Sequence, residues 1–146
     1  MSASNAFENA LLDLILTNVD LANMGDVTGL RGSSTAGSLY ISLHTSDPGE
    51  AGNQTTNECA YTSYARVAVA RSGAAWTVTN DTGENAAAVT FPQATGGSET
   101  ATHFGIGSAA SGTGNLFLSG ALNSSLAISS GITPEFAAGA LDVTVA

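Results

Sequence analysis

The chain has 146 residues, of which 43% are hydrophobic and only 10% are charged, and its formal net charge is −9. One domain with a substantial core is the natural expectation at this length. Twelve carboxylates stand against three arginines, and no lysine occurs, whereas binding to nucleic acid or to anionic lipid requires an excess of cations. We therefore expect neither nucleic acid nor a membrane as a partner.

The first predicted element is a helix from about residue 5 to about residue 16. Its apolar residues recur at helical spacing along one stripe, formed by Phe7, Ala10, Leu11, Leu14 and Ile15. Leu12 and Leu16 widen this stripe, and Asn5 followed by Glu8 resembles a capping pair. The helix either lies on a sheet of its own domain or packs against a neighbouring subunit.

The segment from about residue 17 to about residue 38 is predicted to be a loop or an extended arm, because it is rich in Asn, Gly and Ser. Loops of this length are uncommon inside compact domains and often have a function. Its scattered apolar residues would allow it to dock onto a neighbour, namely Val19, Leu21, Met24, Val27 and Leu30.

After Ser38 the hydrophobic period changes to two, which is typical of half-buried strands. We expect strands near residues 39–44, 64–71, 76–78, 87–91, 102–106, 116–122, 126–128 and 140–145. Roughly eight short strands separated by turns predict an antiparallel β-sandwich or barrel-like domain with one N-terminal α-helix. We assign residues 1–146 to a single β-rich domain, with the β-domain proper over about residues 39–146.

The stretch from Thr100 to Pro134 contains no Asp, Glu, Lys or Arg. Gly, Ser, Thr and Asn interrupt it too often for a membrane-spanning run of about 18 apolar residues. A free soluble protein usually keeps about a quarter of its residues charged. This composition therefore favours a protein that packs against its own copies or against a larger assembly.

Few residues suggest chemistry. Gly105 to Ala110 fits the G-x-G-x-x-A dinucleotide pattern, but the glycines at 112 and 114 would break the required helix, so we expect a hairpin loop. His44 and His103 lack a second ligand at zinc spacing and are expected to be ordinary strand residues. A distant pairing of Cys59 with one of the histidines stays open.

Asp47, Glu50 and Glu58 share one polar loop, but they lack the regular spacing of a calcium loop, so we expect solvated carboxylates. Arg66 and Arg71 are expected to find a carboxylate or to stay exposed. The sequence thus assigns no catalytic, cofactor-binding or metal-binding residue and predicts no cofactor and no enzyme. The single cysteine excludes an intrachain disulfide and suits a reducing compartment, and Asp13 makes the N-terminus a poor secretory signal. We expect synthesis in a cytoplasm.

Several segments together resemble small virion proteins of tailed phages, described as tail fibre or decoration proteins. They are residues 5–13 (NAFENALLD), 39–48 (LYISLHTSDP), 64–66 (YAR), 89–92 (VTFP), 102–106 (THFGI) and 131–141 (GITPEFAAGAL). Their order and spacing carry the resemblance over nearly the whole chain. The segment from about Thr17 to Gly37 departs from it, because a much shorter connection is expected there.

The resemblance implies a structural protein of the virion without catalytic residues. Our main expectation is a capsid decoration, or cement, protein that forms a homo-oligomer, expected to be a trimer, and bridges subunits of the major capsid protein. The alternatives are a tail fibre or baseplate component that contacts the host, and a carbohydrate-binding β-sandwich module. The last would display exposed aromatic residues, with Tyr40, Tyr61, Tyr64 and Trp76 as candidates.

Overall fold

The computed structural model describes residues 3–22, 24, 29 and 32–145. The chain forms two compact units, each assembled from separate stretches of sequence. The first unit comprises residues 1–38, 70–88 and 136–146, and the second comprises residues 39–69 and 89–135. The assignment of the whole chain to a single domain stays a prediction.

The first unit begins with the predicted helix, which consists of α1 (Asn5–Leu12) and a π-helical turn, η1 (Asp13–Thr17). The predicted capping pair is wrong. Ser4 is the N-cap, and its Oγ accepts a hydrogen bond from the amide of Phe7 at 3.4 Å. At the other end Asn18 adopts a left-handed conformation with φ 63°, which ends the helix.

The buried stripe of this helix is rotated from the predicted one. Leu12 and Leu16 are completely buried, and Glu8, one turn earlier on the same stripe, is also buried, while Phe7 is 39% exposed. The helix packs against a sheet of its own unit, which confirms the first of the two alternatives. Hydrophobic periodicity located the helix, but the completely buried side chains, Leu12 and Leu16, lie at the edge of the predicted apolar arc and not at its centre.

The sheet of the first unit has three antiparallel strands in the order β3 (Trp76–Thr79), β4 (Thr82–Asn85) and β9 (Asp142–Thr144). A two-residue turn joins β3 to β4, with Asn80 at φ 58°, the geometry that such hairpins favour. Strand β4 was not predicted, because Thr, Gly, Glu and Asn are typical of a turn. Pairing with both neighbours overrides that local preference.

Gly83 on β4 is the point at which the helix reaches this sheet. A Cβ built on Gly83 would lie 2.3 Å from Cδ1 of Leu16, which is far inside van der Waals contact. The absence of a side chain at Gly83 therefore makes the space into which the fully buried Leu16 packs.

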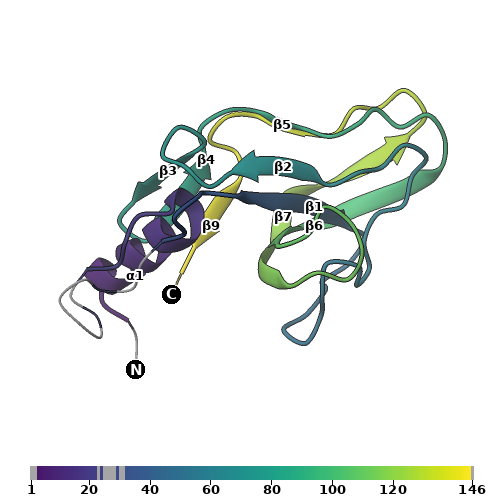
Figure 1. The fold of residues 1–146 in the computed structure, drawn as a ribbon. Helices are drawn as coiled ribbons and strands as arrows, with labels where there is room; N and C mark the ends of the chain where they lie inside the picture. The colour runs from purple at the N-terminus through teal and green to yellow at the C-terminus, as the bar shows by residue number, and fades with distance from the viewer. Residues whose placement is uncertain (1–2, 23, 25–28, 30–31, 146) are drawn as a thin grey trace. The chain divides into compact units, whose positions relative to one another are not determined.

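The second unit holds almost all of a four-stranded sheet in the order β2 (Val67–Ala70), β1 (Ser38–His44), β6 (Ser98–Gly107) and β7 (Leu116–Ser129) (Figure 1). Strands β1 and β6 pair antiparallel with Ile41 opposite Ile106, and β6 pairs antiparallel with β7. The two strands predicted at 116–122 and 126–128 are one long strand whose register shifts part-way along.

A small two-stranded sheet completes the fold, formed by β5 (Val89–Thr90) and β8 (Glu135–Phe136). Strand β8 was not predicted. The chain is therefore mainly β, with antiparallel sheets and one N-terminal α-helix, and the strands within the described residues do not close into a barrel. This confirms the predicted fold class. No helix in the described part of the chain has the length and apolar character to cross a membrane.

Candidate functional site

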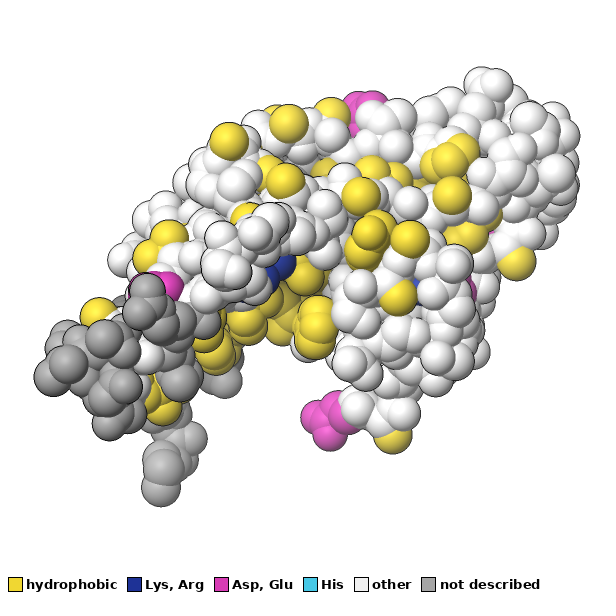
Figure 2. All heavy atoms as spheres, viewed as in Figure 1, with side chains coloured by type: hydrophobic (Ala, Val, Ile, Leu, Met, Phe, Trp, Pro, Cys, Tyr) yellow, Lys and Arg dark blue, Asp and Glu magenta, His cyan; other side chains and the backbone are white. Residues whose placement is uncertain are grey.

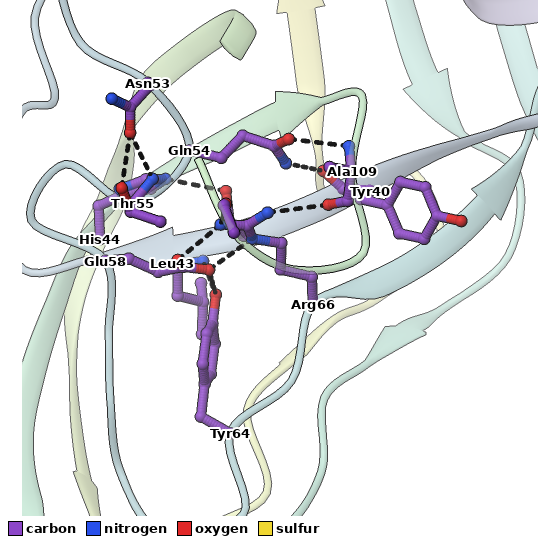
Figure 3. Close-up of polar contacts among 12 residues, drawn as sticks. Tyr40, Leu43, His44, Asn53, Gln54, Thr55, Glu58, Tyr64, Arg66 and Ala109 are labelled. Carbon is purple, nitrogen blue, oxygen red and sulfur yellow. Dashed lines mark hydrogen bonds and ion pairs between the residues drawn. The ribbon is translucent and has the colours of Figure 1, made fainter. Parts of the chain in front are cut away.

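A buried ion pair lies at the centre of the polar groups of the second unit (Figure 3). Nε and Nη2 of Arg66 donate to the two carboxylate oxygens of Glu58 at 2.6 Å and 2.8 Å, so the contact is bidentate. The side chain of Arg66 is only 2% exposed and that of Glu58 only 14%. Hydrogen bonding to Glu58 raises the pKa of Arg66. Such a pair holds its geometry firmly, because each charge would be costly without the other.

The same guanidinium group fixes the connection between β6 and β7. Its Nη1 donates to the carbonyl of Ala109 at 2.9 Å, and its Nη2 donates to the carbonyl of Gly112 at 2.7 Å. Arg66 therefore joins the loop that contains Glu58 to the connection at residues 108–115. A loop of Gly, Ser and Thr would otherwise have few apolar contacts to order it.

Tyr64 extends this network to β1. Its hydroxyl donates to Oε1 of Glu58 at 2.9 Å and accepts from the amide of Leu43 at 3.1 Å. Burial, together with the charge of Glu58, raises the pKa of Tyr64, so the hydroxyl stays neutral and available as a donor. The ring lies edge-on to Tyr61, with centroids 5.2 Å apart.

Gln54 makes a second link to the 108–115 connection. It is completely buried. Its Oε1 accepts from the amide of Ala109 at 2.9 Å, and its Nε2 lies 3.5 Å from the carbonyl of Tyr40 (Figure 3). A Cβ on Gly107 would fall 2.2 Å from Cδ of Gln54. The second glycine of the G-x-G-x-x-A pattern therefore admits this amide, and the pattern runs from β6 into a hairpin connection, as predicted.

His44 forms a second buried polar group on β1. Its Nδ1 lies 2.8 Å from the carbonyl of Thr56 and its Nε2 lies 2.8 Å from Oγ of Ser42. A carbonyl can only accept, so Nδ1 carries the proton and Nε2 accepts from the Ser42 hydroxyl. Burial lowers the pKa of His44. A serine next to a histidine can act as a nucleophile. Both of these side chains are 0% exposed, however, so no substrate can reach the pair in this structure.

His103 lies opposite His44 in the pairing of β1 with β6, a proximity that residue spacing in the sequence could not show. Its Nδ1 contacts Oγ1 of Thr102 at 2.9 Å. No group of three or more His, Cys, Asp or Glu side chains suited to a metal occurs in the described part of the chain. Both histidines are thus strand residues, as expected.

Cys59 does not join either histidine in any hydrogen bond found among the described residues. It is buried, and its backbone amide donates to the carbonyl of Leu43 at 2.8 Å. Burial raises the pKa of the Cys59 thiol to about 12. A thiol with this pKa carries almost no thiolate at neutral pH and is a poor nucleophile or metal ligand.

An open groove of about 570 Å³ lies beside the first half of β7. Asp47, Glu50 and His103 line it together with residues 116–121. The prediction of solvated loop carboxylates is confirmed for Asp47 and Glu50, which are exposed, but it is wrong for Glu58. Glu58 is instead the partner of Arg66 in the buried ion pair described above.

The two described arginines differ in their partners. Arg66 finds a carboxylate, as expected, but Arg71 in the first unit does not. Its Nε donates to the carbonyl of Ile15 at 2.8 Å, and its Nη2 donates to the carbonyl of Leu14 at 2.6 Å. Arg71 therefore caps carbonyl groups near the C-terminal end of the helical segment, where a cation is favourable. Arg31 lies outside the described residues.

The described ends of the predicted arm are held within the first unit. Side-chain oxygens of Asn18 and Asp20 accept hydrogen bonds from the amides of Ser33 and Gly32, respectively, at 2.7 Å each. Leu21 is buried, whereas Val19 and Met24 are exposed. Val27 and Leu30, two of the residues predicted to dock onto a neighbour, lie outside the described residues.

The four aromatic residues considered for sugar binding do not form an exposed face. Tyr61 and Trp76 are buried, at 3% and 1% exposure, and Tyr64 is engaged in the network described above. The face drawn in Figure 2 is mostly backbone and uncharged side chains, with hydrophobic side chains scattered among them and acidic groups at only a few places. The fold and its polar interior thus define a charge-poor, β-rich protein in which Arg66 and Glu58 hold loops in place.

Comparison with known proteins agrees with this class. The sequence model of the family described as "Podophage GP4 fiber I protein gp80" matches residues 2–144. The chain therefore belongs to this family of phage fibre proteins, which confirms its resemblance to structural proteins of tailed-phage virions. No protein in the curated collection matches the chain significantly. The family description fits the tail fibre alternative better than our main expectation of a capsid cement protein.

Proposed function

We propose that this protein is a non-catalytic fibre subunit of a podophage virion, located on the tail and placed where the particle meets its host. The observation that carries the proposal is the match of nearly the whole chain to a fibre family.

The polar interior supports a mechanical role. Arg66, Glu58, Tyr64 and Gln54 form hydrogen bonds that tie the β1–β2 connection to the β6–β7 connection and to strand β1. Such bonds favour one fixed arrangement of the loops over many. A fibre subunit needs a rigid shape, because its contacts are repeated between identical copies.

The chemistry of the remaining groups also agrees with a non-catalytic role. The Cys59 thiol is buried and protonated, and the Ser42–His44 pair is closed to solvent. Activated nucleophiles need the opposite environment, with access to substrate and a favoured charged form. A homo-oligomer completes the proposal.

Locating the protein on purified particles tests the proposal. Quantitative mass spectrometry should find a low copy number relative to the major capsid protein, and antibody labelling in electron micrographs should mark the tail. Antibodies against the second unit should slow adsorption to host cells, with antibodies against the major capsid protein as the matched control. A copy number close to that of the major capsid protein, with label on the head, would instead favour a capsid cement protein. Absence from the particle would contradict the proposal.

A further inference from the structure

Strand β7 is the edge of the four-stranded sheet of the second unit. It pairs with β6 on one side, and no other described strand pairs with its outer side. It is also the longest strand described, and its whole length falls inside the charge-free stretch from Thr100 to Pro134. Exposed edges are commonly protected from pairing with a second chain by a charged side chain, a Pro or a β-bulge. Strand β7 carries no charged residue and no Pro, and its register shifts interrupt only part of the edge.

The apolar side chains of β7 are incompletely covered. Strand β1, at the centre of the same sheet, is buried along most of its length, whereas Leu116, Leu118, Leu122 and Leu126 of β7 are only partly buried. Phe117 is 49% exposed. The register shift between Ile106 and Gly107 leaves Phe117 as an extra residue in β7, which makes it a bulged residue, and bulges often redirect a side chain.

The pairing of β7 with β6 is irregular at two points, but regular stretches of β7 remain between and beyond them. The pairing with β6 is regular from Leu118 to Ala121 and again from Leu126 to Ser129. Two stretches of outer backbone therefore remain available for pairing. The carboxylate of Glu99 on the neighbouring strand accepts hydrogen bonds from the amides of Ala60 and Tyr61 at 2.7–3.2 Å.

The charge distribution indicates what covers this edge. Two copies of a chain with net charge −9 repel each other over most of their surfaces. The two described arginines are engaged internally and offer no cation to a second copy. A surface without charged side chains lets identical copies meet with less of this penalty. Strand β7 carries no charged residue, although Asp47 and Glu50 line the groove beside its first half. We propose that the outer edge of β7 is the interface through which this chain contacts a second copy of itself. This inference rests on the proposed function as a fibre subunit.

Lysine substitutions on β7 test the interface directly. Ala127 and Ser119 are exposed positions on the two regular stretches. We expect Ala127→Lys and Ser119→Lys to weaken self-association by about tenfold or more, measured by sedimentation equilibrium, because each places a charged side chain in the interface, where it loses its hydration. Each substitution makes the net charge less negative, so general electrostatics would strengthen association. Only a local effect can weaken it.

Thr77→Lys is the matched control. Thr77 is exposed on β3, the edge of the three-stranded sheet, and the change adds the same charge at the same kind of position. We expect this variant to associate at least as strongly as the unmodified chain. Circular dichroism of every variant establishes that the fold is kept. An equal loss of association in all three variants would overturn the inference.

Thiol labelling gives a second measurement that does not depend on lysine. The native Cys59 is buried, with a pKa raised to about 12, so it should stay silent in the folded protein. The rate of maleimide labelling of Ala127→Cys should fall as the protein is concentrated through its association midpoint, and that of Thr77→Cys should not.

The outcomes separate this inference from the proposed function. An oligomer that tolerates both β7 lysines overturns the inference, as does a chain that stays monomeric at every concentration. Protection of Ala127→Cys only in intact particles would also overturn it, because the partner would then be another virion protein. In all three cases the location of the chain on the particle still decides the fibre assignment independently.

Discussion

Both units of this protein bury apolar side chains, in the second unit Ile41, Leu43, Phe91, Ile106 and Ile128 among others, but the two units differ in their polar interactions. In the first unit, fully buried apolar side chains from the helix and the sheet, Leu12, Leu16, Trp76 and Leu141, supply the core. In the second, a buried ion pair and uncharged polar groups hold loops against the sheet. Arg66 is one of only three cations in the chain, and it is buried. Breaking its ion pair with Glu58 should therefore have a large effect on stability. We expect the second unit to be far more sensitive to single polar substitutions.

The largest expected effect follows loss of the buried carboxylate. Glu58→Gln leaves the Arg66 guanidinium, 2% exposed, without its counter-charge. Breaking such a pair costs about 3–5 kcal/mol of unfolding free energy, measured by urea denaturation. Hydrogen exchange should show reduced protection within the second unit first. Glu50→Gln, an exposed carboxylate in the same loop region, is the control and should change little. Equal effects of both variants would contradict the role of the ion pair.

The next effect concerns the helix contact in the first unit. Leu16→Ala should cost about 2–5 kcal/mol through the cavity it creates, and Gly83→Ala should cost about 1–3 kcal/mol through overpacking against Cδ1 of Leu16. Combining the two should cost less than their sum, because the new methyl group occupies space that Leu16 vacates. Urea denaturation of the four proteins in this double-mutant cycle measures the coupling. Simple additivity would show that Gly83 does not make room for Leu16.

A smaller effect should appear as a dependence of stability on pH. Burial lowers the pKa of His44 below its ordinary value of 6.5, so the unfolded chain binds the proton more readily than the folded one. Stability from this residue is therefore complete above pH 6.5 and is lost as the pH falls below it. His44→Gln should remove this part of the pH dependence, measured by urea denaturation at several pH values. His103→Gln is the control, and an identical pH profile for the unmodified chain and His44→Gln would contradict the prediction.

The smallest effect is expected for the second described arginine. Arg71 is partly exposed and donates to neutral carbonyl groups, so Arg71→Gln should cost only about 0.5–1.5 kcal/mol. Thermal denaturation should show a small shift and hydrogen exchange a local change near the end of the helix. A loss as large as that of Glu58→Gln would break the contrast drawn between the two units.

Much of the fold could be predicted from the sequence, because periodicity is a local property. The helix over about residues 5–16 and most strands agree with the structure. Strand β4 could not be predicted, since Thr82 to Asn85 is typical of a turn and becomes a strand only by pairing with β3 and β9. The candidate site was only partly predictable. An internal partner for Arg66 was expected, but Glu58 was assigned to solvent.

The amino-acid sequence by itself determined the fold class, the low content of charged residues and the resemblance to phage virion proteins, because composition, hydrophobic period and motif order are properties of the chain alone. Only the tertiary structure decided which charges are buried together, which histidines face each other and which strand is left at an edge. These features depend on residues far apart in sequence, such as Arg66 and Ala109, and therefore on how the strands pair.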